Sequence, residues 1–262
     1  MIVPMLKGGI ANQMFAIAAG LSVSLDAKTD LCINYNLPHA CGQGKSPVIY
    51  KNNFFKKIKE TTSLPTYRYN EPDWSYSPIP IKEDMLIDGY FQSFKHFSKY
   101  EKHVKDLFVF PDHIAAKTTK GLNNLKKKTI GIHVRLGDYL LPGYISTHLV
   151  CNRDYYIRAL QCFENLDDYQ IIVCTDNIND YNKYIKIDNA IICNGADELE
   201  DMYVLSQCDN LIISNSSFSW WSAFLGTEKK KIIAPDTWFG CDGPKNFSDI
   251  YMDNWIKIKT TL

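Results

Sequence analysis

The sequence predicts an α/β fold made of two doubly wound halves that face each other across a cleft. Short apolar runs alternate with segments of helical periodicity, and this alternation indicates parallel sheets with crossover helices. The 262 residues, 45% of them hydrophobic, suffice for one large domain or two smaller ones. Because Pro111 suits a hinge, we predict an N-terminal α/β domain at 1–110 and a C-terminal α/β domain at 111–262.

The first half begins with the pattern of a strand, a turn and a helix. We predict a strand at 2–6, a turn through Gly8 and Gly9, and a helix at 13–25, where apolar residues recur three and four positions apart. Between 38 and 80, glycine, proline, asparagine and aromatic residues break the pattern, so loops are expected there. The remaining expected elements are strands at 31–35 and 85–90 and a helix at 94–107.

The second half alternates more regularly. Its expected strands lie at 130–134, 171–174, 190–193, 211–214 and 231–234. Its expected helices lie at 153–163, 179–185, 198–207 and 218–225. Ligands of such sheets bind beyond the carboxyl ends of the strands, so residues that follow these strands are the first candidates for a site.

The composition excludes several classes of protein. The 29 lysines and arginines balance 29 aspartates and glutamates, and no basic patch points to a nucleic-acid partner. No secretory leader and no apolar run of membrane-spanning length is evident. The eight cysteines form no C-x-x-C pair, and several lie in apolar runs, which favours free thiols in a reducing compartment. We therefore expect a cytoplasmic protein with no transmembrane segment, peripheral membrane contact being left open.

His133 and Arg135 are the first candidates for chemistry. Side chains alternate along the predicted strand at 130–134, so these two emerge together at its carboxyl end. A guanidinium fork beside an imidazole suits a phosphate or a diphosphate. The alternative is a structural ion pair between Arg135 and Asp138.

A second candidate follows the predicted strand at 211–214. A hydroxyl-rich turn containing Ser216 and Ser217 leads into a helix at Phe218, and the helix N–H groups with the two hydroxyls would form a neutral cradle for an anion. An ordinary serine N-cap explains one serine but not the whole cluster. Gly226 suits the C-terminal end of this helix.

Asp201 has two interpretations. Asp197 and Glu200 match a capping box, whereas Asp201 lies at the edge of the expected core. A surface carboxylate is the simpler interpretation. The functional one is a carboxylate that accepts paired hydrogen bonds from the N–H edge of a base such as guanine.

Gly8 and Gly9, between the first strand and the first helix, permit a close backbone approach to a ligand. Asn12 beside them is explained most simply as a helix N-cap. The segment fails as a dinucleotide fingerprint, because G-x-G-x-x-G is absent. The chain also lacks Asp-x-Asp, the usual carboxylate pair for a metal-bound nucleotide sugar, so no metal ligand and no cofactor is assigned.

Together these motifs resemble the α-1,2-fucosyltransferases of glycosyltransferase family 11, with a wider likeness to the α-1,6- and protein O-fucosyltransferases. The resemblance implies a GT-B fold of two Rossmann-like domains, with GDP-β-L-fucose bound by the C-terminal domain and a terminal β-galactoside as acceptor. It also implies metal-independent transfer with inversion. The matching stretches, in order, are GGIANQMF at 8–15, HVRLGDY at 133–139, CTDN at 174–177, the segment 199–226 that contains SNSSFSWW, and APDTWF at 234–239.

The resemblance also implies roles for single residues. Arg135 would hold the β-phosphate and stabilise the departing GDP, with His133 nearby, and Asp201 would recognise guanine. Asp138 is the candidate general base, and Asp176 belongs to the substrate site without an assigned role. Ser216, Ser217 and Phe218 would line the diphosphate and fucose, and Asn12, Gly8 and Gly9 would face the reaction centre from the N-terminal half.

Two departures and two alternatives accompany this hypothesis. The family motif usually carries a second arginine where this chain has Leu136, and commonly glycine where it has Ala11. One alternative is α-1,6 transfer, or transfer from another GDP-sugar, on the same fold. The other is a nucleotide- or glycan-binding module without turnover, against which Arg135, Asp138 and Asn12 weigh.

Overall fold

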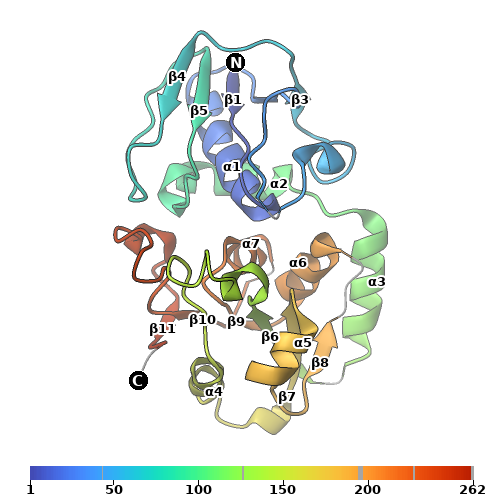
Figure 1. Ribbon diagram of the computed structural model, residues 1–262. Helices are drawn as coiled ribbons and strands as arrows, with labels where there is room; N and C mark the ends of the chain where they lie inside the picture. The colour runs from blue at the N-terminus through green and yellow to red at the C-terminus, as the bar shows by residue number, and fades with distance from the viewer. Residues whose placement is uncertain (43, 126, 194–196, 227, 261–262) are drawn as a thin grey trace. The chain divides into compact units, whose positions relative to one another are not determined.

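The chain is organised in two compact units. The computed structural model (Figure 1) describes residues 1–262 except 43, 126, 194–196, 227 and 261–262. The first unit comprises Met1–Pro111 and Asn246–Met252, and the second comprises Asp112–Lys245 and Asp253–Leu262. The short segment Asn246–Met252 therefore departs from the predicted division at 110/111: Asp249 accepts a hydrogen bond of 2.8 Å from the backbone N–H of Tyr76 in the first unit.

The first unit holds a parallel sheet whose strands follow the order β1, β5, β4. Helix α1 (Ile10–Asp26) follows β1 and is buried over most of its length. A separate parallel pair is formed by β2 and β3. The strand bounds are β1 (Ile2–Pro4), β2 (Cys32–Ile33), β3 (Lys59–Glu60), β4 (Tyr67–Asn70) and β5 (Met85–Asp88).

Two predictions for the first unit were wrong in part. The stretch 38–80 is not all loop, since it contains β3 and β4; β4 is a largely exposed edge strand and so lacks the apolar run that marks a buried one. The helix expected at 94–107 is α-helical only in α2 (Glu101–Leu107). Two 3₁₀ turns, η2 (Phe94–His96) and η3 (Ser98–Tyr100), precede it, because Phe97 between them leaves helical geometry with φ −138° while its ring is fully buried.

The second unit contains one parallel sheet with the strand order β11, β10, β9, β6, β7, β8. The chain starts at β6, steps outward through β7 to β8, then returns to β9 on the other side of β6 and steps outward again. This is the strand order of a Rossmann sheet, with the reversal between β6 and β9. The bounds are β6 (Lys128–Val134), β7 (Tyr169–Thr175), β8 (Ile191–Cys193), β9 (Asn210–Ile212), β10 (Lys231–Pro235) and β11 (Ile256–Ile258).

The first helix of this unit precedes β6, and the others lie between successive strands from β6 to β10. They are α3 (Asp112–Asn123), α4 (Arg153–Leu160), α5 (Ile178–Asp180) with the π-helical turn η6 (Tyr181–Ile185), α6 (Glu198–Gln207) and α7 (Ser217–Leu225). Short 3₁₀ turns lie at Gly137–Leu140 and Leu166–Asp168 in this unit, and at Pro47–Tyr50 and Ser248–Ile250 in the first unit. Neither α3, which is mostly exposed, nor the short edge strand β11 was predicted, because neither contains a strong apolar pattern. Across the described residues, we find no helix with both the length and the apolar character needed to cross a membrane.

The core of the second unit fixes the carboxyl end of β6. Tyr155 and Tyr156 of α4 are fully buried against this strand. Their hydroxyls donate hydrogen bonds to backbone carbonyls at the ends of strands, Tyr155 to Ile213 at 2.6 Å and Tyr156 to His133 at 3.2 Å. Both rings therefore contribute apolar burial without leaving an unsatisfied hydroxyl.

Gly131 of β6 faces the side of the sheet covered by α6, where neighbouring side chains leave no room for a Cβ atom. A Cβ atom at this position would lie 2.7 Å from Cδ2 of Leu211 and 3.0 Å from Sγ of Cys208. The strand can approach α6 this closely only because residue 131 has no side chain.

We expect Gly131→Ala to lower the free energy of unfolding by about 1–3 kcal/mol through overpacking. Gly121→Ala, in exposed space on α3, is the matched control and should raise it by about 0.5–1 kcal/mol. Urea denaturation followed by tryptophan fluorescence measures both, since four of the five tryptophans lie in the second unit. Equal effects of the two substitutions would contradict the packing described here.

Candidate functional site

The carboxyl ends of β6 and β9 bring two of the predicted segments together. These strands are hydrogen-bonded neighbours at the point where the strand order reverses. In open α/β sheets this reversal opens a crevice, and nucleotides bind there. His133 and Arg135 leave from β6, and Ser216 with α7 follows β9.

Arg135 is held by two carboxylates. Its Nη2 atom lies 2.5 Å from Oδ1 of Asp138 and its Nη1 atom lies 2.9 Å from Oδ2 of Asp176. The guanidinium also lies 5.2 Å from the centre of the Tyr139 ring. The structural ion pair with Asp138 that the spacing left open is therefore present, and Asp176 joins it from the end of β7.

Asp176, whose role the sequence left unassigned, organises the turn after β6. Its Oδ1 atom accepts a hydrogen bond of 2.9 Å from the backbone N–H of Leu136. A Cβ atom at Gly137 would lie 2.4 Å from Oδ2 of Asp176, so the carboxylate can approach only a glycine at this position. One carboxylate therefore fixes both the backbone of the turn and the guanidinium of Arg135.

The charges around Arg135 do not form an open phosphate cradle in this state. One guanidinium faces two carboxylates, and its side chain is only 29% exposed. Burial raises the pKa of Asp176 above its usual value, while the guanidinium of Arg135 opposes that shift. A phosphate that binds here has to take hydrogen bonds of Arg135 away from Asp138 and Asp176 or share them.

His133 joins the two strands rather than facing solvent. It is buried, and its Nδ1 atom lies 2.8 Å from the hydroxyl oxygen of Ser214, just beyond β9. Its ring centre lies 5.1 Å from that of Phe218 on α7. Burial, with the nearby charge of Arg135, lowers the pKa of His133 to about 3, so the ring is neutral at pH 7. Its role in this state is to connect β6 with the start of α7.

The start of α7 matches the expected N-cap. Ser216 is the N-cap, and its hydroxyl oxygen accepts a hydrogen bond of 3.3 Å from the backbone N–H of Phe218. Ser217 and Phe218, both half-buried, are the first two helical residues, so helix N–H groups are directed to this edge of the sheet.

At the other end of α7, Gly226 is the C-cap as expected, but its φ of −77° is not left-handed. Glycine is needed there for space, because a Cβ atom would lie 2.0 Å from the carbonyl oxygen of Ser206.

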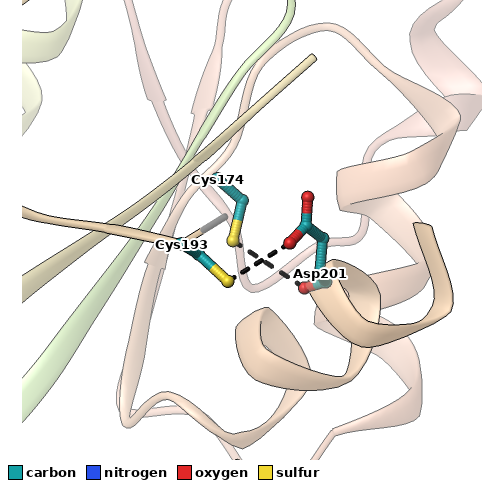
Figure 2. Close-up of side chains that lie close together, drawn as sticks. All are labelled: Cys174, Cys193 and Asp201. Atoms are coloured by element: carbon teal, nitrogen blue, oxygen red, sulfur yellow. Dashed lines mark hydrogen bonds between the residues drawn. The ribbon is translucent and has the colours of Figure 1, made fainter. Parts of the chain in front are cut away.

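Asp201 lies in the first turn of α6 beside two cysteines, Cys174 and Cys193, which the sequence analysis did not select as site residues. The thiol of Cys193 donates a hydrogen bond of 3.2 Å to Oδ1 of Asp201, as Figure 2 shows. The thiol of Cys174 lies 3.9 Å from the backbone carbonyl oxygen of Asp201. Cys193 is the last residue of β8 and Cys174 the last but one of β7, and the two are paired in register. Their position near the carboxyl ends of two predicted strands was the sequence signal that could have selected them.

One of the two hydrogen bonds of the expected capping box at α6 is the bond to the N-cap side chain, and it is present. Asp197 accepts a hydrogen bond of 3.0 Å from the backbone N–H of Glu200. The carboxylate of Glu200 forms an ion pair with Lys117 of α3. This ion pair attaches α3 to the helix that carries Asp201.

The predicted residues of the first unit form a tight turn before α1. Gly8 has φ +65°, and a Cβ there would lie 2.4 Å from Nδ2 of Asn12, so glycine is required. Gly9 is the N-cap of α1, which corrects the interpretation of Asn12 as the cap: Asn12 lies inside the helix. Its Oδ1 atom accepts a hydrogen bond of 2.7 Å from Nε2 of Gln92, a residue that the sequence analysis did not select.

Two α/β units, one of which has a parallel sheet of Rossmann strand order, are the architecture of the GT-B fold. NodZ α-1,6-fucosyltransferase, crystallised with GDP, shares this fold with a TM-score of 0.59 at 14% identity, over 90% of this chain and 94% of that one. The family model described as glycosyl transferase family 11 matches residues 22–259. The chain therefore belongs to glycosyltransferase family 11, and the resemblance inferred from its motifs is confirmed.

Two bacterial relatives are similar over most of the chain. The Escherichia coli O-antigen biosynthesis glycosyltransferase WbnK is 28% identical over 81% of this chain and 73% of its own length. An α-1,2-colitosyltransferase of Escherichia coli is 26% identical over 98% of this chain and 99% of its own length. Galactoside α-(1,2)-fucosyltransferase 2 of Hylobates lar is 26% identical over 62% of this chain and 52% of its own length.

The neutral, buried state of His133 makes a prediction about pH. The imidazole of the unfolded chain has a pKa of about 6.5. Below this pH the unfolded chain binds a proton at His133 and the folded chain does not, so the free energy of unfolding decreases as the pH is lowered. Between pH 7 and pH 5 this linkage costs about 2 kcal/mol. We expect His133→Gln to lose that much less stability than the wild type over this range, measured by urea denaturation at both pH values. Parallel losses in the two proteins would show that His133 is not held neutral.

Proposed function

We propose that this family 11 glycosyltransferase moves L-fucose from GDP-β-L-fucose to the 2-hydroxyl of a terminal β-galactoside, with inversion and without a metal ion. The observation that carries the proposal is that Arg135 and the N-terminus of α7 follow the neighbouring strands β6 and β9, at the point where the strand order reverses. Cationic and N–H donors converge there, as a departing diphosphate requires. Similarity to WbnK, named for O-antigen biosynthesis, supports a surface polysaccharide as the acceptor.

In the proposed donor step, Arg135 exchanges a carboxylate partner for the β-phosphate of the donor. The β-phosphate takes hydrogen bonds from the guanidinium, and this exchange loosens the ion pair between Arg135 and Asp138. Asp176 keeps the turn in place through the backbone N–H of Leu136. Ser216, Ser217 and Phe218 would line the diphosphate and fucose, and Asp201 would accept hydrogen bonds from the N–H edge of guanine.

In the proposed transfer, the bond between C1 of fucose and the β-phosphate oxygen breaks, and its electron pair remains on GDP. The acceptor O2 forms the new bond to C1 from the opposite face. The acceptor proton passes to the carboxylate of Asp138, which accepts it more readily once Arg135 has turned to the phosphate. Asn12, held by Gln92, and the turn at Gly8 and Gly9 would serve the acceptor side from the first unit.

A second candidate differs only in the sugar that is transferred. The α-1,2-colitosyltransferase matches this chain over nearly the full length of both proteins, which favours a colitosyl donor as the alternative to fucose. The linkage would be the same. The two candidates are therefore separated by the donor and not by the acceptor bond.

We expect GDP release from GDP-L-fucose when a β-galactoside is present, in buffer that contains EDTA, with an α-1,2 product identified by NMR. The reaction without acceptor is the control. Turnover with a colitosyl donor alone would select the second candidate. GDP binding without turnover on any β-galactoside would favour a binding module, and absence of GDP binding would contradict the proposal.

We expect Arg135→Ala to lower kcat by about 10²–10³-fold, because a preorganised donor to the departing phosphate is lost. Arg153→Ala removes an exposed arginine at the start of α4 and should leave kcat unchanged. Circular dichroism of both variants checks the fold, since Arg135 also balances Asp138 and Asp176. Wild-type turnover by a folded Arg135→Ala protein would remove Arg135 from the mechanism.

A further inference from the structure

Three groups capable of ligating a metal converge at the carboxyl ends of β7 and β8. The Sγ atoms of Cys174 and Cys193 and a carboxylate oxygen of Asp201 all lie within 4.8 Å of one another. Figure 2 shows the two thiols and the carboxylate pointing toward a common point, from two strands and one helix. None of the three residues is fully exposed, and Cys174 is buried.

The fold explains why these groups meet. The parallel register pairs Cys174 with Cys193, so both side chains lie on the same face of the sheet, toward α6. Asp201 lies one turn into α6, whose start is fixed by the Asp197 cap and by the ion pair between Glu200 and Lys117. The cluster is thus held by regular elements and not by a loose loop.

The distances suit a tetrahedral thiophilic cation. Around Zn²⁺, with Zn–S of about 2.3 Å and Zn–O of about 2.1 Å, ligand atoms lie roughly 3.6–3.8 Å apart. The 3.2 Å between Sγ of Cys193 and Oδ1 of Asp201, and the 4.8 Å limit for the whole set, differ from this by about 1 Å or less. Two thiolates and one carboxylate select a soft or borderline cation over Mg²⁺ or Ca²⁺.

We propose that Cys174, Cys193 and Asp201 form a binding site for a thiophilic divalent cation such as Zn²⁺, and that a cation bound there excludes the guanine of the donor. Binding releases the two thiol protons and leaves a fourth position for water. The exclusion follows because the paired hydrogen bonds from guanine use both carboxylate oxygens of Asp201, and the cation would occupy one of them. This second part rests on the proposed recognition of guanine by Asp201.

The binding test titrates the full-length protein with Zn²⁺ against a chromophoric chelator, with a phosphine reductant present throughout. We expect one tight equivalent in the wild type and at least a tenfold loss of affinity in Cys193→Ser, Cys174→Ser and Asp201→Asn, since outer-shell changes alone cost about 10–100-fold. Cys193→Ser keeps a hydrogen-bond donor beside Asp201 and removes only the soft ligand. Cys241→Ser, which removes an exposed thiol outside the cluster, is the matched control and should retain the tight equivalent.

The competition test repeats the titration with saturating GDP and measures the KM for the donor with and without Zn²⁺. We expect GDP to weaken Zn²⁺ binding, and Zn²⁺ to raise the donor KM of the wild type but not of Cys193→Ser. The metal site would be overturned if the wild type bound no Zn²⁺ tightly, or if the cluster variants bound Zn²⁺ as the wild type does. Zn²⁺ and GDP binding independently would overturn the exclusion. If the chain binds no GDP even without Zn²⁺, the proposed function fails while the Zn²⁺ titration still decides the site.

Discussion

The reversal of strand order between β6 and β9 is the constraint on which the second unit depends. Parallel pairing places the carboxyl ends of β6, β7, β8 and β9 along one edge, so segments far apart in the chain meet there. The hydrogen bond between His133 and Ser214 and the two tyrosine hydroxyls of α4 fix that edge. Because those polar groups are buried and paired, they hold the ends of the strands in a fixed arrangement.

Two carboxylates face a single guanidinium at this edge. A half-buried guanidinium needs partners, and Asp138 and Asp176 supply them. In the proposed mechanism, the donor phosphate competes with these carboxylates for Arg135. That exchange would release Asp138, the proposed base, so acceptor activation would follow occupation of the donor site.

Two proposed roles meet in the first turn of α6. Asp201 is the proposed acceptor for the guanine base, and the thiols of Cys174 and Cys193 lie beside it as soft ligand atoms. All eight cysteines are free thiols, so this pair is not engaged in a disulfide. The proposed cation site overlaps the proposed nucleotide site, so under these proposals a cation would affect donor binding although the transfer itself uses no metal.

The sequence by itself determined the α/β class, most strands of the second unit and the family, because apolar periodicity and contiguous motifs such as HVRLGDY and SNSSFSWW are local properties. It missed β4, α3 and β11, which are exposed or short and have a weak apolar pattern. Only the tertiary structure decided that Asp176 holds Arg135 and that Cys174 and Cys193 meet Asp201. Those contacts depend on strand register and order, which bring together residues whose separation in the chain carries no local signal.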